Sequence, residues 1–471
     1  MIRTTCTMAD DPNFIFVFFT VSCCIWLQCI PVSCQESAKY GFDKTVYAAT
    51  EPKQAWNYTT IRPHAHMFWW LYYTTATEGY LNKPLVLWLQ GGPGASSTGF
   101  GNFQEIGPLD VDLNHRTTSW ISKASLLFVD NPVGTGFSYV DEDSAYTTNV
   151  SMIADDLVLL MRQLMTVDIP HFQTIPFYIF SESYGGKMTA AFSKALHHAV
   201  WATGLPCNFK GLVMGDSWIL PIYYVMTWAP YLYSTSIVDR RGFENILKVA
   251  KDAQDAVEKG EFARATQLWS ETENVVEANG NGVNFYNILK WNSDSVRQIT
   301  VEEKKVFQNK PYLASLYGHH VLPMAEDKLS KLMNGFVREK LRIIPRRVKW
   351  GGQSGEVFSK QSGDFMKSVV DIVDFLLDMT NLNVVVYNGQ LDLICNTLGT
   401  ENWVQTLKWP HLQDFFNSTR IPIMDKATGE TQAFVKRFKN FSFYWILKAG
   451  HMVPADAGET ALKVLDMIIK Y

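Results

Sequence analysis

A serine that could act as a nucleophile follows a short, strongly apolar stretch of the chain. Residues 177–180 are all apolar or aromatic, which predicts a buried strand, and a helical pattern begins at Lys187. A chain that turns at once from strand to helix exposes the side chain at the bend, as in the nucleophile elbow G-x-S-x-G. Ser183 has that position, with Ser181 at the first glycine and Gly185 at the second. The pentapeptide alone is a weak signal, because serines between small residues are common.

Two further candidates each follow a later predicted strand. Asp392 comes after a strand at 384–387, and His451 comes after a strand at 443–447. Alone, an aspartate in a turn is by default solvated, and a single histidine is more often structural than catalytic. Ser183, Asp392 and His451 nevertheless follow the chain order that the α/β-hydrolase topology imposes. They predict a catalytic triad in which His451 takes the serine proton and Asp392 fixes the imidazole tautomer.

A glycine-rich turn at 90–97 directly follows a predicted strand at 85–89. The turn lacks the lysine of a P-loop and the spacing of a dinucleotide-binding motif, which disfavours phosphate binding. We expect the N–H groups of Gly92 and of Tyr184, the residue after the nucleophile, to form an oxyanion hole. A tight turn without a catalytic role stays open as the alternative for this stretch.

Two histidines have a spacing that could suit a metal ion. His64 and His66 would point to one face of a strand, but no third ligand is evident nearby in the sequence. We therefore expect no metal site, and we expect no other cofactor.

The candidate residues need a parallel sheet to bring them together, and the chain alternates as such a sheet requires. Strands separated by helices, with near-continuous apolar runs, predict an α/β fold with both sheet faces covered. Strands are expected at 67–73, 85–89, 125–129, 177–180, 212–214, 384–387 and 443–447, and helices at 155–165, 187–196, 365–379 and 459–469.

The alternation stops in the middle of the chain. Between 221 and 363 the strand signal is weak and amphipathic helices recur, near 243–257, 263–278 and 325–343. We interpret this part as a mostly helical cap, inserted over the carboxyl edge of the sheet. The predicted division is a signal peptide at 1–34, a first core part at 35–220, the cap at 221–363 and a second core part at 364–471. The length agrees with such a division, because 471 residues are more than a single hydrophobic core usually contains.

The first 34 residues have the pattern of a secretory leader. An apolar run at 14–27 is short for a membrane span and precedes small residues, which favours a cleaved signal peptide over an uncleaved anchor. Several N-glycosylation sequons agree with this route, and they begin at Asn57, Asn149, Asn417 and Asn440. We expect a secreted or lysosomal protein with no membrane partner after signal removal. The formal net charge of −4 gives no reason to expect nucleic acid as a partner, and monomer and homodimer both stay open.

The cysteines do not form a disulfide framework. Of the seven, all but two lie in or beside the leader, so the mature chain would keep Cys207 and Cys395. A bridge between these two and a pair of free, buried thiols are both open.

Several segments together resemble the signatures of the serine carboxypeptidases, and they lie at 88–94, 130–139, 182–186, 387–392 and 450–454. The resemblance covers essentially everything after the leader. It implies an α/β-hydrolase core with a helical cap. It also implies a serine-type carboxypeptidase that releases C-terminal residues from peptides with a free C-terminus, usually at acidic pH.

The resemblance further implies a site for the terminal carboxylate of the substrate, formed by Gln90, Glu105 and Glu182. Carboxyl groups crowded near a substrate carboxylate cannot all be ionised, so some must share protons, which accounts for an acidic optimum. Gln90 departs from the usual asparagine of the family by one methylene, which could displace carboxylate recognition. Cys395 matches a family position near the substrate, and we expect Cys395 and Met452 to line the pocket.

Two other functions compete with this interpretation. An esterase or acyltransferase on the same scaffold would use the same triad, but an ester without a free carboxylate has no use for Glu105 and Glu182. A secreted binding or protective protein would keep the fold without turnover. The intact triad argues against that function, whereas Gln90 leaves it open.

Overall fold

The computed structural model describes residues 51–290, 312 and 327–470. The predicted signal peptide lies outside these residues. Within the described part, no helix is both long enough and apolar enough to cross a membrane.

A single large sheet forms the centre of the molecule, in the strand order β1-β2-β4-β3-β6-β7-β8-β11-β10-β9, with β5 paired to β2. Its middle strands are parallel, and they are β4(Ser125–Val129), β3(Leu85–Leu89), β6(Pro176–Glu182), β7(Asn208–Gly215), β8(Asn383–Gly389) and β11(Phe441–Ile446). Antiparallel strands extend both edges, and they are β1(Gln54–Arg62), β2(Ala65–Tyr72), β5(Tyr139–Val140), β9(Ile421–Met424) and β10(Thr431–Phe438). The mostly parallel sheet of the predicted α/β-hydrolase fold is therefore confirmed.

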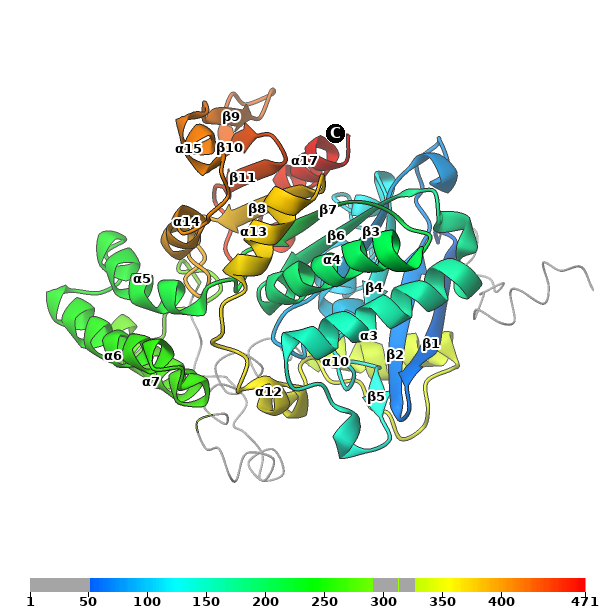
Figure 1. Ribbon diagram of the computed structural model, residues 1–471, viewed down its shortest axis with the longest axis horizontal. Helices are drawn as coiled ribbons and strands as arrows, with labels where there is room; N and C mark the ends of the chain where they lie inside the picture. The colour runs from blue at the N-terminus through cyan, green and yellow to red at the C-terminus, as the bar shows by residue number, and fades with distance from the viewer. Residues whose placement is uncertain (1–50, 291–311, 313–326, 471) are drawn as a thin grey trace, which may run out of the picture.

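The apolar runs form the central strands because both faces of the sheet are covered. Along β3, the side chains of Leu85, Leu87 and Leu89 pack into a first core cluster on one face of the sheet. Val86 and Trp88 pack into a second core cluster on the other face. Helices α3(Val150–Gln163), α4(Tyr184–Thr203) and α13(Val370–Met379) lie together in front of the sheet in Figure 1. The second core cluster includes residues of α17(Gly458–Ile469) and of the π-helix η3(Ser97–Ile106).

Several elements differ from the sequence-based expectations at the edges. Strand β1 and strands β9 and β10 have partly exposed, mixed sequences, so their apolar pattern is weak. Helix α3 begins before the predicted start at 155, because the side chain of Asn149 accepts the N–H of Met152 and caps it. The remaining helices of the second core part are α14(Thr397–Gln405), α15(Leu412–Asn417) and α16(Val453–Asp456).

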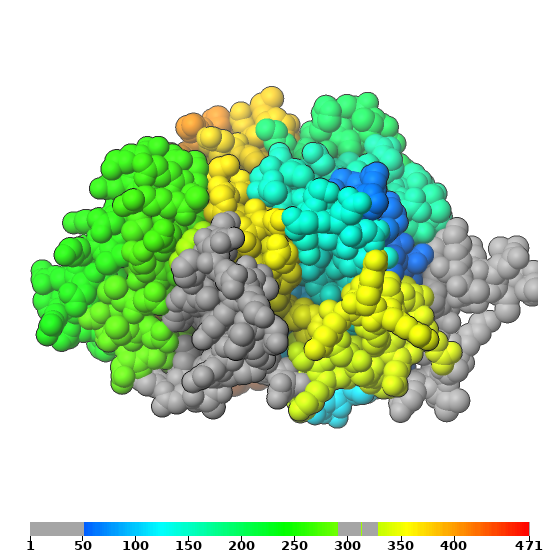
Figure 2. All heavy atoms as spheres, turned by 90° about the horizontal axis from the view of Figure 1, so that it is seen from below, coloured from blue at the N-terminus to red at the C-terminus, as the bar shows by residue number. Residues whose placement is uncertain are grey.

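Among the described residues of the inserted segment, two parts pack differently. Helices α5(Pro221–Ser234), α6(Arg240–Glu258) and α7(Phe262–Gly280) form a helical lobe beside the sheet (Figure 1). Residues 327–350, which include α10(Asp327–Leu332), η8(Met333–Val337) and α11(Arg338–Leu341), contribute buried side chains to the second core cluster. Figure 2 shows the green lobe and these yellow-green residues on opposite sides of the yellow segment that contains α12(Gly355–Gln361). The boundaries at 221 and 363 stay a prediction, and this packing favours assigning residues 327–350 to the core.

The end of the inserted segment is attached to the glycine-rich turn. Ala95 and Gln353 form an isolated β-bridge, and the N–H of Ser96 donates to the carbonyl of Gly352 at 2.9 Å. Trp350 adds a side-chain contact, because its Nε1 donates to Ser96 Oγ at 3.0 Å. The chain thus returns to the core directly beside the turn that follows β3.

Candidate active site

Ser183 lies at the sharp turn between β6 and α4. Its φ of 63° and ψ of −131° are outside the regions that serine usually occupies. The Ser183 N–H donates to the carbonyls of Gly215 and Asp216, both at 3.1 Å, which holds this conformation. A Cβ added at Gly185 would lie 2.4 Å from the carbonyl oxygen of Leu89, so the helix can pass the sheet here only without a side chain.

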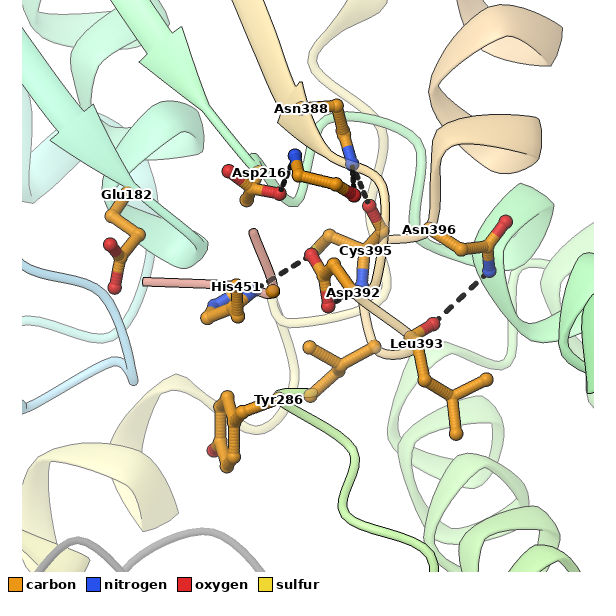
Figure 3. A network of polar contacts seen from close by, with 12 residues as sticks. Glu182, Asp216, Tyr286, Asn388, Asp392, Leu393, Cys395, Asn396 and His451 are labelled. Carbon is orange, nitrogen blue, oxygen red and sulfur yellow. Dashed lines mark hydrogen bonds and ion pairs between the residues drawn. The ribbon is translucent and has the colours of Figure 1, made fainter. Parts of the chain in front are cut away.

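His451 and Asp392 form a buried, hydrogen-bonded pair (Figure 3). His451 Nδ1 lies 2.8 Å from Asp392 Oδ2, and the two residues are 2% and 0% exposed. Because an ionised carboxylate only accepts hydrogen bonds, Nδ1 carries the proton and Nε2 is the basic nitrogen. The other carboxylate oxygen, Oδ1, accepts the backbone N–H of Cys395 at 3.3 Å. Asp392 is thus fixed by two donors and in turn orients the imidazole.

Ser183 and His451 line the same pocket. The pocket walls are largely aromatic and come from both the core and the inserted segment, with Trp218, Trp269, Tyr286, Phe358, Phe365 and Ile394 among them. This arrangement is suited to a hydrophobic side chain beside the candidate nucleophile.

Gly92 and Tyr184 line this pocket as well. Within the described residues, neither backbone N–H donates a hydrogen bond. Tyr184 is the first residue of α4, where helical N–H groups have no intrahelical acceptor. The two N–H groups are therefore available to an oxyanion beside Ser183.

The turn that contains Gly92 is held in place by Asp130, which is fully buried. The Asp130 carboxylate accepts hydrogen bonds from Ser96 Oγ at 2.7 Å, from Thr98 N and Oγ at 3.0 and 2.8 Å, and from Phe137 N at 2.8 Å. No sequence pattern predicted a role for Asp130, although Asp130 begins one of the segments that resemble the serine carboxypeptidases. A single buried carboxylate that joins three loop positions is a contact that only the fold reveals.

A pair of buried carboxyl groups lies next to the pocket. Glu105 and Glu182 are 1% and 2% exposed, and Glu182 also lines the pocket. Gln90 Nε2 donates to Glu182 Oε1 at 2.9 Å, while Gln90 Oε1 accepts from Trp88 Nε1 at 2.7 Å. Burial raises the pKa of both glutamates, and the neighbouring Glu105 raises the pKa of Glu182 further. The pair therefore holds a proton at pH values where exposed glutamates have lost theirs.

The structure places the predicted pocket residues Cys395 and Met452 differently. Within the described residues, neither is among those that line the pocket. Cys395 is fully buried next to Asp392, and burial raises the pKa of its thiol well above the usual range. Cys207 is also buried, and both cysteines are free thiols, so they do not form a bridge with each other.

Two groups of residues could be considered for a metal ion. Asp392, Cys395 and His451 have ligand atoms within 4.8 Å of one another, but their closest contact is the hydrogen bond of the triad pair. For the other group, the sequence showed no third ligand, whereas the fold places Asp141 Oδ2 2.9 Å from His66 Nε2 and 3.8 Å from His64 Nδ1. His66 Nδ1 is engaged by Thr60 Oγ1 at 2.9 Å. We therefore interpret the histidines as partners in surface hydrogen bonds and ion pairs.

The four sequon asparagines are not equivalent in the fold. Asn417 is exposed at the end of α15. Asn440 Nδ2, the atom that would carry a glycan, donates to the carbonyls of Leu377, Thr380 and Leu382 at 3.1, 3.4 and 3.3 Å. The other two, Asn57 and Asn149, are half-buried, and each accepts a backbone N–H at its Oδ1.

Comparisons with known proteins agree with this geometry. The family model described as serine carboxypeptidase matches residues 45–471. Retinoid-inducible serine carboxypeptidase of Mus musculus is 49% identical over 449 residues, covering 95% of this chain and 97% of the relative. The human protein of that name is 49% identical over 445 residues, covering 94% and 96% of the two chains. Serine carboxypeptidase-like 51 of Arabidopsis thaliana is 40% identical over 453 residues, covering 94% and 97%.

A solved structure supports the fold independently. A prohormone-processing carboxypeptidase from Saccharomyces cerevisiae matches with a TM-score of 0.72 and 22% identity, covering 88% of this chain and 91% of the other. The predicted resemblance is thereby confirmed, and the chain belongs to the serine carboxypeptidase family.

Proposed function

We propose that this protein removes C-terminal residues from peptides through an acyl-enzyme formed on Ser183. The observation that carries this proposal is the buried Glu105–Glu182 pair, which borders the pocket of the Ser183–His451–Asp392 arrangement. A hydrolase for neutral esters needs the triad but not a protonated carboxyl beside it. A peptide with a free C-terminus has a carboxylate that such a group can bind as a hydrogen-bond donor.

The proposed reaction uses His451 Nε2 as a proton shuttle. Ser183 Oγ attacks the carbonyl carbon of the last peptide bond while its proton moves to Nε2. The N–H groups of Gly92 and Tyr184 bind the oxyanion that forms. The C–N bond then breaks, the leaving amine takes the proton from Nε2, and the terminal amino acid departs. Water gives a proton to Nε2 and attacks the ester, and Ser183 recovers its proton as the shortened peptide leaves.

The proposed carboxylate site predicts higher activity at acidic pH. A protonated Glu182 can donate to the substrate carboxylate, and Gln90 holds Glu182 through its other oxygen at 2.9 Å. As the pH rises through the raised pKa of Glu182, the donor is lost and a negative charge appears beside the substrate carboxylate. We infer that peptide binding weakens with rising pH for this reason.

The proposed setting is the secretory pathway, either outside the cell or in the lysosome. The predicted leader and the exposed sequon at Asn417 support this location.

The test compares a blocked dipeptide with its C-terminal amide and with a simple ester, at pH 5 and pH 7. We expect the free acid to be cleaved, faster at pH 5, and a serine-directed fluorophosphonate to abolish cleavage. Hydrolysis of the ester alone would favour an esterase or acyltransferase. Labelling of Ser183 without turnover of any of these substrates would mean a working nucleophile that acts on another substrate. Neither labelling nor turnover would favour a secreted binding or protective protein.

A further inference from the structure

Asp216 is a buried carboxyl group that the proposed triad mechanism does not use. It directly follows β7, and its side chain is 0% exposed. Its φ of 42° lies in the left-handed region, which aspartate, asparagine and glycine tolerate best. A buried acid in such a conformation requires specific partners, and these partners belong to the candidate active site.

The backbone of Asp216 joins two strands at the edge where the site lies. Its carbonyl accepts the N–H of Ser183 at 3.1 Å, and its own N–H donates to the carbonyl of Tyr387 at 2.9 Å. One side-chain oxygen, Oδ1, accepts the N–H of Gly389 at 2.7 Å. Asp216 thus contacts both the nucleophile turn and the strand end that precedes Asp392, and Figure 3 shows the second of these contacts.

The second side-chain oxygen has an unusual environment. Asp216 Oδ2 is buried and, within the described residues, accepts no hydrogen bond. The carboxyl group of Asp216 interacts with that of Asp392, and no described lysine or arginine forms an ion pair with either residue. Two carboxylates in contact without a cation cannot both be ionised, so one of them must carry a proton.

The hydrogen bonds decide which carboxyl group carries the proton. Asp392 accepts from two donors, the Nδ1 of His451 and the N–H of Cys395. Among the described residues, the side chain of Asp216 accepts from one donor, the N–H of Gly389. The ionised form is favoured where more donors converge, which is at Asp392.

We propose that Asp216 is a positioning residue whose protonated carboxyl group donates a hydrogen bond to the carboxylate of Asp392. This third donor would fix Asp392 toward His451 without adding a charge to the site. The proposal rests on the triad of the proposed function, but not on the identity of the substrate.

The surrounding charges favour the neutral form of Asp216. Burial and the neighbouring Asp392 raise the pKa of Asp216 well above its usual range, and Asp456 contributes in the same direction. The other titratable groups that interact with Asp216 are Glu182, Tyr387 and Cys395. None of them is a cation that would stabilise an ionised Asp216.

Two substitutions distinguish the effect of the Asp216–Asp392 hydrogen bond from the effects of the charge and the volume of the Asp216 side chain. Asp216→Asn keeps the acceptor for Gly389, offers an N–H to Asp392 and stays neutral. Asp216→Gly removes the side chain, while glycine tolerates the φ of 42° without strain. The readout is the rate constant for labelling of Ser183 by a fluorophosphonate between pH 4 and pH 9, with kcat and KM for a blocked dipeptide measured alongside.

We expect Asp216→Gly to lower the labelling rate and kcat by about tenfold or more, with little change in KM, because a hydrogen bond to a charged group is lost away from the substrate. Asp216→Asn should recover most of that loss. The acid limb of its pH profile should stay within about 0.3 pH units of that of the parent protein, because the net charge near His451 is unchanged.

The outcomes that overturn the proposal are distinct. If Asp216 were ionised, Asp216→Asn would remove a negative charge, and the acid limb would move to lower pH by about one unit or more. A loss in Asp216→Asn equal to that in Asp216→Gly, or no loss in either, would also refute the proposal. Should Asp216→Gly fail to fold, as judged by thermal unfolding, the pH profile of Asp216→Asn decides alone. Absence of labelling in the parent protein would refute the triad itself, whereas labelling without peptide turnover would refute only the carboxypeptidase.

Discussion

The carbonyl oxygen of Tyr286 accepts the backbone N–H of His451 at 2.7 Å, and the two rings meet edge to face with their centroids 5.2 Å apart. Tyr286 follows α7 at the end of the helical lobe, whereas His451 follows the last strand of the core. The lobe is therefore connected directly to the candidate general base. It also closes the pocket, since Tyr286 and Trp269 both line it.

We expect Tyr286→Ala to lower kcat by about tenfold, because the imidazole loses the ring that restricts its orientation. Tyr286→Phe keeps the ring and should retain most of the activity. Steady-state kinetics on a blocked dipeptide, with thermal unfolding as the folding control, measures the difference. Equal activity of the alanine and phenylalanine variants would show that the ring contact does not position His451.

Ser183→Ala should abolish peptide cleavage and fluorophosphonate labelling, because no other group replaces the nucleophile. The substitution removes one oxygen at a position fixed by backbone hydrogen bonds, so folding and secretion should persist. Secreted yield and circular dichroism serve as the controls. Activity equal to that of the parent protein would exclude Ser183 as the nucleophile.

Glu182→Gln tests the protonated carboxyl group. The pKa of Glu182 is raised, so its donor is present at low pH and is lost as the pH rises through that pKa. The KM of the parent protein for a free-acid peptide should therefore rise by about tenfold or more between pH 5 and pH 8. Glutamine stays neutral and keeps a donor, so the KM of the variant should change by less than about threefold over the same range. The ester of the same peptide is the matched control, since it lacks the carboxylate. Parallel KM profiles for the two proteins would remove Glu182 from carboxylate recognition.

Gln90→Asn shortens the side chain that links Trp88 to Glu182. One of its two hydrogen bonds, at 2.7 and 2.9 Å, cannot be kept after the loss of a methylene. We expect KM to rise by about five- to tenfold with a small change in kcat, because a buried partner is left unsatisfied. A lower KM in the variant would mean that the parent glutamine displaces the substrate carboxylate, as the departure from the family pattern suggests.

The sequon positions predict unequal glycosylation. Asn417→Gln should lower the mass of the secreted protein by one glycan, because Asn417 is exposed. Asn440→Gln should leave the glycan mass unchanged, since Asn440 Nδ2 donates to three backbone carbonyls in the fold. Intact mass before and after enzymatic deglycosylation tests both. A glycan found on Asn440 would require these hydrogen bonds to be absent in the secreted protein.

Much of the fold could be predicted, because the central strands have a signal that does not depend on context. The strands at 85–89 and 125–129 have their predicted bounds, since both faces are buried and every residue is apolar or small. Strands β9 and β10 could not be recognised, because a partly exposed strand at the edge of the sheet has a mixed composition.

Some residues of the candidate site could be predicted from the sequence and others could not. Ser183, Asp392 and His451 could be found because each closely follows a recognisable strand, so that topology alone brings the strand ends to one edge. Tyr286, Asp130 and Asp216 act through partners that are distant in the chain, and no local pattern marks such contacts. Asp216 was visible in the sequence two residues after the predicted strand at 212–214, but its position beside Asp392 depends on the strand order β7-β8.

The bridge between Ala95 and Gln353 has a consequence for exchanging parts between relatives. The inserted segment is fastened to the core on both sides of the pocket, at Gln353 beside the glycine-rich turn and at Tyr286 beside His451. A chimaera that takes α6 and the first turns of α7 from another member keeps both attachments. A chimaera that takes Tyr286 and His451, or Ala95 and Gln353, from different parents must match two surfaces that were selected in different proteins. Chimaeras made to exchange substrate preference should therefore fold and remain active when both crossovers lie in the outer lobe. They should fail when a crossover separates either pair of contacting residues.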